Sequence, residues 1–117
     1  APCTATGTCR RHSDVLHRIG TRHIAEMADL QAQLLARAAG RLKPDGQLIY
    51  AVCSLEREEG EAQALEFAGN SGLKIDPIGA DELPAGLQPS AQGWLRTTPD
   101  MLTENGGLDG FFIVRFR

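Results

Sequence analysis

The sequence lacks the marks of a membrane or secreted protein. No apolar run approaches the roughly 20 residues that cross a bilayer, and no signal peptide is recognisable. Its three cysteines are an odd number, which excludes a complete disulfide framework, and no Cys-x-x-Cys pair is present. These absences predict a soluble, cytoplasmic protein.

The sequence also lacks a strong charge of either sign. The formal net charge is −3 at pH 7, which argues against nucleic-acid binding by bulk charge alone. Most acidic residues lie from Glu56 onward, whereas the first third holds three histidines together with Arg10, Arg11, Arg18 and Arg22. A local basic patch is therefore compatible with an acidic whole.

The length allows one domain at most, or a piece of one. The 117 residues are 42% hydrophobic and 23% charged, which is ordinary for a protein with a packed core. The chain begins Ala1-Pro2-Cys3, without methionine, so we expect it to be part of a longer protein.

Hydrophobic periodicity and turn residues predict an alternation of helices and strands. The first part of the chain is expected to form a loop over residues 1–14, a helix from about Val15 to Leu42 and a buried strand over 47–52. The second part is expected to form a helix from about Arg57 to Ala68, an edge strand over 73–78, a short strand over 94–96 and a strand over 111–116. The first helix is expected to break near Gly20-Thr21 with Thr21 as the N-cap of its second part, and Ser54 is expected to cap the second helix. This order predicts an α/β fold with a mostly parallel sheet and an antiparallel last strand.

Cys53 is the candidate reactive residue. It follows the buried strand and precedes the helix-prone acidic segment. Ligands sit at the carboxyl ends of strands in open α/β sheets, and a helix start stabilises a thiolate. These features favour Cys53 as a nucleophile, while the simpler interpretation is a small buried apolar residue.

Three motifs, in order and through nearly the whole chain, resemble the RNA 5-methylcytosine methyltransferase family. Its bacterial members that modify small-subunit ribosomal RNA are the most similar. The motifs are Ala-Pro-Cys-Thr-Ala-Thr-Gly with Arg-Arg-His-Ser-Asp over residues 1–14, Tyr-Ala-Val-Cys-Ser-Leu over 50–55, and Asp-Gly-Phe-Phe over 109–112. Val52 replaces a usual threonine and Ser13 a usual proline, and neither change removes a catalytic group.

The resemblance implies the C-terminal half of a Rossmann-like domain that uses S-adenosylmethionine. It implies that Cys53 adds to C6 of cytosine in ribosomal RNA, that Cys3 assists product release, and that the base leaves its stack. The glycine-rich loop and the acidic residues that hold the cofactor lie upstream in the family. We therefore expect residues 1–117 to be a partial catalytic domain that is inactive alone, with an exposed sheet edge that favours self-association.

Other residues have weaker assignments. Arg10, Arg11 and His12 are candidate RNA contacts, although the arginines could instead pair with acidic residues of the fold and His12 could be a hydrogen-bonded loop residue. The acidic run at 56–61 is most simply a solvated helix start, and Trp94 and the Phe111-Phe112 pair are more simply core than base-stacking platforms.

Three alternatives remain open. Cys3, Cys9, His12 and His17 could suggest zinc, but they lack a close cysteine pair, and Cys9 has no expected role. A non-catalytic fragment could dock RNA or a protein through the Arg10–Arg22 segment. A different thiol-dependent enzyme is disfavoured, because no histidine is placed by sequence as a base.

Overall fold

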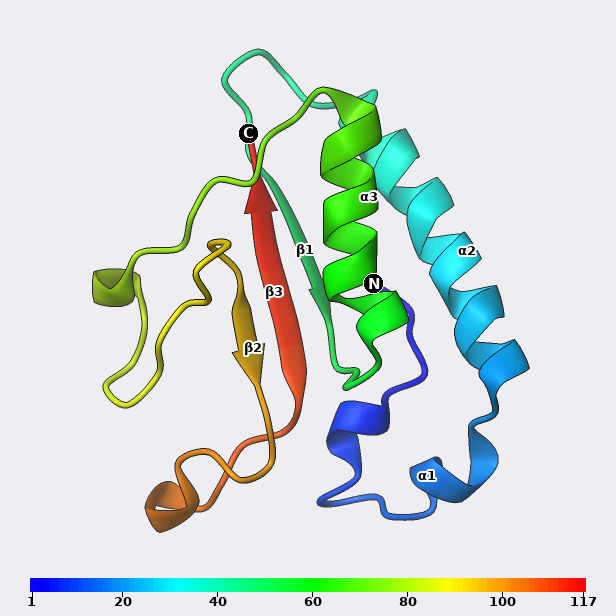
Figure 1. The fold of residues 1–117 in the computed structure, drawn as a ribbon, viewed down its shortest axis with the longest axis vertical. Helices are drawn as coiled ribbons and strands as arrows, with labels where there is room; N and C mark the ends of the chain where they lie inside the picture. The colour runs from blue at the N-terminus through cyan, green and yellow to red at the C-terminus, as the bar shows by residue number, and fades with distance from the viewer.

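The chain forms a three-stranded sheet with two helices packed on one face (Figure 1). The computed structural model describes residues 1–117. Its elements are η1 (Thr6–Thr8), α1 (Val15–Arg18), α2 (Thr21–Ala39), β1 (Leu48–Val52), η2 (Arg57–Glu59), α3 (Glu61–Ser71), η3 (Ala80–Glu82), β2 (Leu95–Thr97), η4 (Thr103–Asn105) and β3 (Phe111–Phe116), the η elements being short 3₁₀ helices.

The core lies between the sheet and the two long helices. In β3, alternate side chains face this core, so that Phe112, Val114 and Phe116 are fully buried. Phe67 of α3 meets Phe116 edge-on, with ring centroids 4.8 Å apart. Burying each such side chain contributes on the order of 2–3 kcal/mol, so this face holds the layers together.

The sheet is antiparallel, which corrects the mostly parallel sheet expected from the sequence. Its order is β1-β3-β2, and both pairings are antiparallel. The expected antiparallel last strand is confirmed, but it lies in the centre and pairs with both neighbours. The 73–78 segment does lie at the edge, but it makes only one isolated antiparallel bridge, from Ile75 to Phe116. The parallel expectation failed because β3 inserts beside β1, where a helix-joined strand was predicted.

The two long helices lie in the predicted regions, but their N-caps differ from the predicted residues. The break near Gly20 is confirmed, but Gly20 itself is the N-cap of α2, so the prediction of Thr21 was wrong. α3 begins at Glu61 and continues to Ser71, beyond the predicted end near Ala68, and Gly72 then stops it at φ 76°.

Aromatic residues outside the helices are mostly in the core, as predicted. Trp94 is buried, and its ring lies 5.7 Å from that of Phe112. Phe111 is an exception, because it points to the uncovered face of the sheet and is 40% exposed.

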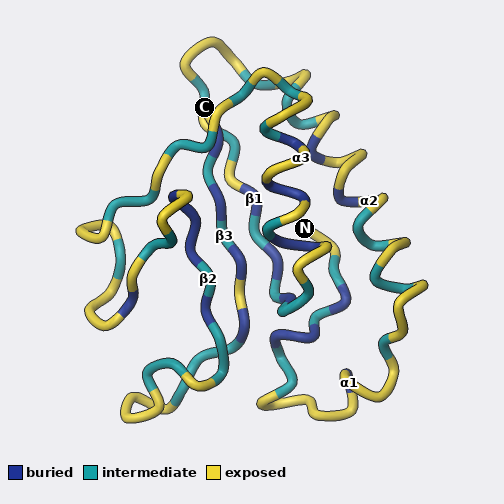
Figure 2. The backbone as a smooth tube through the Cα atoms, in the orientation of Figure 1, coloured by how far each residue is buried: buried dark blue, intermediate teal, exposed yellow.

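Part of the first loop is buried although the loop has no apolar pattern. Thr4, Thr6 and Gly7 are buried, and Figure 2 shows a buried stretch of this loop near the end of β1 and the start of β3. The N–H of Gly7 donates to the carbonyl of Cys53 at 3.1 Å, and the N–H of Gly110 donates to the carbonyl of Gly7 at 2.7 Å. The loop is therefore tied to both strands.

One edge of the sheet is open. β1 pairs with β3 only, and Ile49 on this strand is 64% exposed. Self-association through this edge stays a prediction. None of the helices has the length and apolar character needed to span a bilayer.

The Gly7–Gly110 contact leads to a stability prediction. A Cβ on Gly7 would lie 1.9 Å from the carbonyl oxygen of Gly110, so Gly7→Ala must displace the loop. We expect it to lower the free energy of unfolding by about 2–4 kcal/mol, measured by urea denaturation.

Gly69→Ala is the matched control, because Gly69 lies inside α3 with open space around its Cα. It should be neutral or raise the free energy of unfolding by about 0.5–1 kcal/mol, since alanine is the better helix former. Equal effects of the two substitutions would contradict the proposed close approach.

Candidate active site

The structure brings Cys3 and Cys53 together. They lie 50 residues apart in the sequence, yet their sulfur atoms are 3.5 Å apart and both side chains are half-buried. Cys3 comes from the first loop, and Cys53 follows the last residue of β1. The two cysteines to which the resemblance assigns attack and release therefore lie side by side, and their roles stay predictions.

The backbone fixes this meeting of two loops. Besides the Gly7 bond to Cys53, the N–H of Leu55 donates to Oγ1 of Thr6 at 3.0 Å, and the nitrogen of Ala1 donates to the carbonyl of Ala51 at 2.7 Å. These bonds flank both cysteines, so the sulfurs meet because their chains run side by side.

Burial and the neighbouring sulfur both affect the protonation of Cys3. Burial raises the pKa of the Cys3 thiol to about 11, and the neighbouring Cys53 sulfur contributes to this rise. At neutral pH, Cys3 is therefore a protonated thiol that can donate its S–H toward Cys53.

Cys53 does not lie at the start of a helix, contrary to the prediction. Residues 54–60 separate it from α3, which begins at Glu61. Ser54 does not cap α3 either, since its hydroxyl accepts from the N–H of Glu56 at 3.0 Å and donates to the carboxylate of Glu59 at 2.7 Å. A cation does lie nearby, because Arg96 donates to the carbonyl of Ser54 and forms an ion pair with Glu61 at 2.7 Å.

The carboxylate beneath the two thiols belongs to Glu59, which was predicted to be solvated. Glu59 is fully buried, whereas Arg57 and Glu58 beside it are exposed. Its side chain accepts hydrogen bonds from Thr4, Gln31 and Ser54, from three separate segments. The sequence does not distinguish Glu59 from its solvated acidic neighbours, because donors such as Thr4 and Gln31 are distant in the chain.

The basic candidates gather around Asp109. Arg11 forms a two-pronged ion pair with this carboxylate, and Arg10 approaches it more loosely at 3.7 Å. The Arg11 guanidinium holds the pKa of Asp109 below its usual range. His12 is exposed, and its backbone N–H donates to the carbonyl of Thr8 at 2.9 Å. Of the two roles predicted for these arginines, the structure shows pairing with an acidic residue of the fold, and RNA contact stays a prediction.

No metal site accompanies the cysteines. The chain contains no group of three or more histidine, cysteine or acidic side chains that could hold a metal ion. Cys9 is half-buried at the end of η1 and has no place in the thiol pair.

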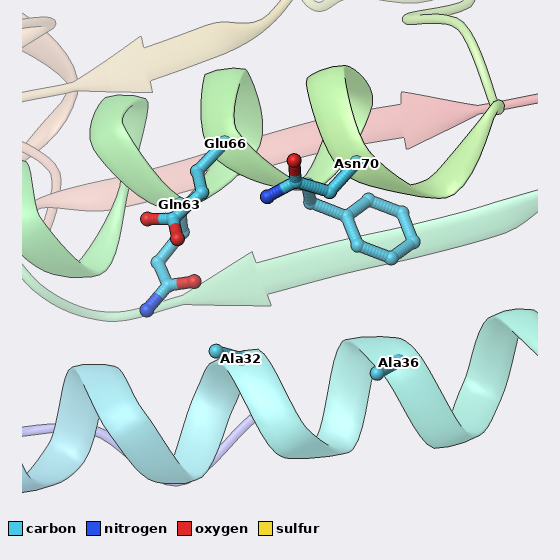
Figure 3. Close-up of a pocket in the computed structure, with 6 residues that line it drawn as sticks. Ala32, Ala36, Gln63, Glu66 and Asn70 are labelled. Atoms are coloured by element: carbon cyan, nitrogen blue, oxygen red, sulfur yellow. The ribbon is translucent and has the colours of Figure 1, made fainter.

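The cavities of the structure lie away from the thiols. Figure 3 shows the hollow between α2 and α3, where Gln63, Glu66 and Asn70 of α3 face Ala32 and Ala36 of α2. Its volume is about 150 Å³. Neither Cys3 nor Cys53 lines this or any other cavity, so this chain alone does not enclose a base-sized pocket around them.

The sequence matches the family described as 16S rRNA methyltransferase RsmB/F over residues 1–117. The ribosomal RNA small subunit methyltransferase B of Thermus thermophilus is 36% identical over 118 residues, which cover 100% of this chain and 27% of the relative. The protein of the same name from Klebsiella pneumoniae is 49% identical over 67 residues, which cover 57% of this chain and 16% of its own length.

A solved structure is similar over the whole chain. NSun6 from Pyrococcus horikoshii, determined with SFG, has a TM-score of 0.79 at 28% identity, covering 100% of this chain and 28% of that chain. This chain therefore spans about a quarter of the length of its full-coverage relatives, being 27% of one and 28% of the other. The family match covers the whole chain, and the chain therefore belongs to the RsmB/F family of 16S ribosomal RNA methyltransferases.

Proposed function

We propose that the protein containing this chain methylates C5 of cytosine in ribosomal RNA through a covalent adduct between Cys53 and the base. The observation that carries the proposal is the 3.5 Å approach of two half-buried thiols in a chain of this methyltransferase family. C5 of cytosine is a poor nucleophile, so carbon–carbon bond formation there needs covalent activation, for which a thiolate is well suited.

Cys53 is the attacking group in this proposal. After its thiol proton has passed to solvent water, the Cys53 sulfur bonds to C6 of the flipped-out cytosine, and the electrons of the C5–C6 double bond move to C5, which becomes nucleophilic. After C5 has gained its methyl group, loss of the C5 proton re-forms the double bond and expels the sulfur as a thiolate.

Cys3 assists the second half of this sequence. Because burial keeps it protonated, its S–H can donate to the Cys53 sulfur as negative charge returns there. Such a donor stabilises the leaving thiolate and speeds cleavage of the carbon–sulfur bond. The proton from C5 passes to solvent water, because the protonated Cys3 thiol does not accept it.

The methyl donor in this proposal is S-adenosylmethionine, supported by the relative solved with SFG, an analogue of that cofactor. The residues of this chain do not fit the cofactor by themselves. The apolar hollow of about 280 Å³ beside β1 is lined only by Ala1, Leu34, Leu35, Ala38, Leu48, Ile49 and Tyr50. None of these side chains is charged, and the one hydroxyl, on Tyr50, already donates to the Glu59 carbonyl. We therefore assign the cofactor site to residues outside this chain and expect the isolated chain to be inactive.

Arg10, Arg11 and His12 are the proposed RNA contacts of this chain, in a cytoplasmic enzyme. Both side chains are exposed, but Arg11 is engaged at both prongs by Asp109, whereas Arg10 only approaches this carboxylate at 3.7 Å. Arg10 is therefore the guanidinium with the greater freedom to bind a phosphate. The rival interaction fragment has less support, because Arg18 and Arg22 are also paired, with Asp14 and Glu26.

Replacing the proposed nucleophile tests the central claim. Cys53→Ala in the complete enzyme should lower methylation of its ribosomal RNA by more than about a thousandfold, because the one neighbouring thiol, Cys3, is held protonated and is a poor nucleophile. Tritium transfer from labelled S-adenosylmethionine measures this. Cys9→Ala is the matched control and should keep its rate, and normal activity of Cys53→Ala would refute the mechanism.

Replacing the second thiol should trap the intermediate. Cys3→Ala leaves attack by Cys53 possible but slows elimination, so a protein–RNA adduct should accumulate on denaturing gels. The Cys3→Ala/Cys53→Ala double variant should show none. Absence of any adduct from Cys3→Ala would overturn the role in release.

RNA contact can be tested through its salt dependence. Arg10→Gln should weaken RNA binding about three- to tenfold and reduce the slope of log K against log salt by about 1, because one phosphate contact is lost. Arg41→Gln is the control, since Arg41 is exposed beyond the far end of α2 and forms no ion pair. Equal slopes for Arg10→Gln and the unsubstituted protein would rule the contact out.

A further inference from the structure

We propose that Glu59 is a positioning residue that holds the sulfurs of Cys3 and Cys53 at reacting distance. Its effect on catalysis rests on the proposed function, whereas its effect on the distance between the thiols does not. Glu59 touches neither sulfur, and it acts through the residues next to them in the chain.

The carboxylate of Glu59 collects four donors. Oε2 accepts from the N–H of Thr4 at 3.0 Å and from Nε2 of Gln31 at 2.7 Å. Oε1 accepts from the hydroxyl of Ser54 at 2.7 Å and from the hydroxyl of Thr4. Glu59 has no ion-pair partner and no exposed surface, so hydrogen bonds alone satisfy its charge.

The donors bracket the two thiols. Thr4 directly follows Cys3, and Ser54 directly follows Cys53. Gln31 extends the same network to the other side of Cys3, because its Nε2 also donates to the carbonyl of Pro2 at 2.9 Å. One carboxylate therefore fixes both neighbours of one cysteine and one neighbour of the other.

Glu59 is itself held in place from β1. The hydroxyl of Tyr50 donates to the Glu59 carbonyl at 2.6 Å, so the η2 turn is anchored to β1, the strand that ends one residue before Cys53. Burial raises the pKa of Tyr50, and the Glu59 charge raises it further, so this phenol remains a donor. This contact between Glu59 and β1 does not involve the first loop.

A carboxylate suits this position because Thr4 N–H and Nε2 of Gln31, which bond to Oε2, can only donate. In Glu59→Gln, the amide N–H₂ faces either these two donors or the hydroxyls of Ser54 and Thr4, which must then turn their own protons elsewhere in order to accept. Glu59→Gln therefore keeps the volume but weakens the bonds that tie Thr4 or Ser54 in either orientation. A buried charge of this kind is costly for stability alone, which favours a role in specifying geometry.

The test measures the distance between the thiols through their oxidation. Diamide, an azo oxidant, removes two electrons and two protons from the thiols, so that a Cys3–Cys53 disulfide forms and the azo group becomes a hydrazine. The rate is followed in the complete protein by mass spectrometry of the linked peptides. We expect Glu59→Gln to slow this reaction by about ten- to a hundredfold, because displacement by about 1 Å has effects of that size.

Glu59→Gln should affect kcat and KM of methylation differently. A lower kcat with little change in KM for RNA is expected, since the displaced groups react with the base without binding the rest of the RNA. Gln63→Ala is the matched control: Gln63 is also buried, bonds to the Ala28 carbonyl and lies away from the cysteine loops. It should lower Tm without changing the rate of disulfide formation.

Each result decides between the alternatives. An unchanged rate of disulfide formation in folded Glu59→Gln overturns the positioning role, even if Cys53 is the nucleophile. If Glu59→Gln does not fold, Ser54→Ala removes one donor from the same carboxylate, and it must slow disulfide formation relative to Gln63→Ala. Full methylation by Cys53→Ala would refute the proposed function while leaving the disulfide result intact.

Discussion

The structure around the two thiols depends on a single buried carboxylate and the donors that satisfy it. Glu59 lies where the first loop, α2 and the turn after β1 converge, and it bonds to all three. Because a buried charge is tolerated only when hydrogen bonds surround it, these segments cannot separate without leaving it unsatisfied. The first loop has no apolar pattern, but its residue Thr4 is thereby held in a buried position by hydrogen bonds.

The sheet supplies the frame for this network. β3 lies between β1 and β2 and buries Phe112, Val114 and Phe116 against the helices. Its first residue follows Gly110, which bonds to Gly7 of the first loop. β3 therefore holds both the end of β1 and the first loop in place. The positions of the two sulfurs depend on backbone contacts and on polar side chains that connect the loops.

The sequence predicted the parts of this site that have local signals. Periodicity located the two long helices, the strand before Cys53 and the last strand, and family motifs singled out Cys3 and Cys53. It did not reveal that Glu59 is buried, because an acid within Glu56–Glu61 resembles its solvated neighbours. The antiparallel sheet order also escaped prediction, since strand order depends on contacts between residues 60 positions apart, as in Val52–Phe112. Asp109 lay within a quoted motif, but its pairing with Arg11 needed the fold.

The contact between Gly7 and Gly110 also limits how the site could be redesigned. Altering base preference would call for new side chains on the loops that surround the thiols. At these two positions the backbones already touch, and a side chain on either would displace the chain that carries Cys3 or the start of β3. Libraries for altered specificity should therefore leave both glycines fixed and place diversity at exposed positions such as Arg10 and His12.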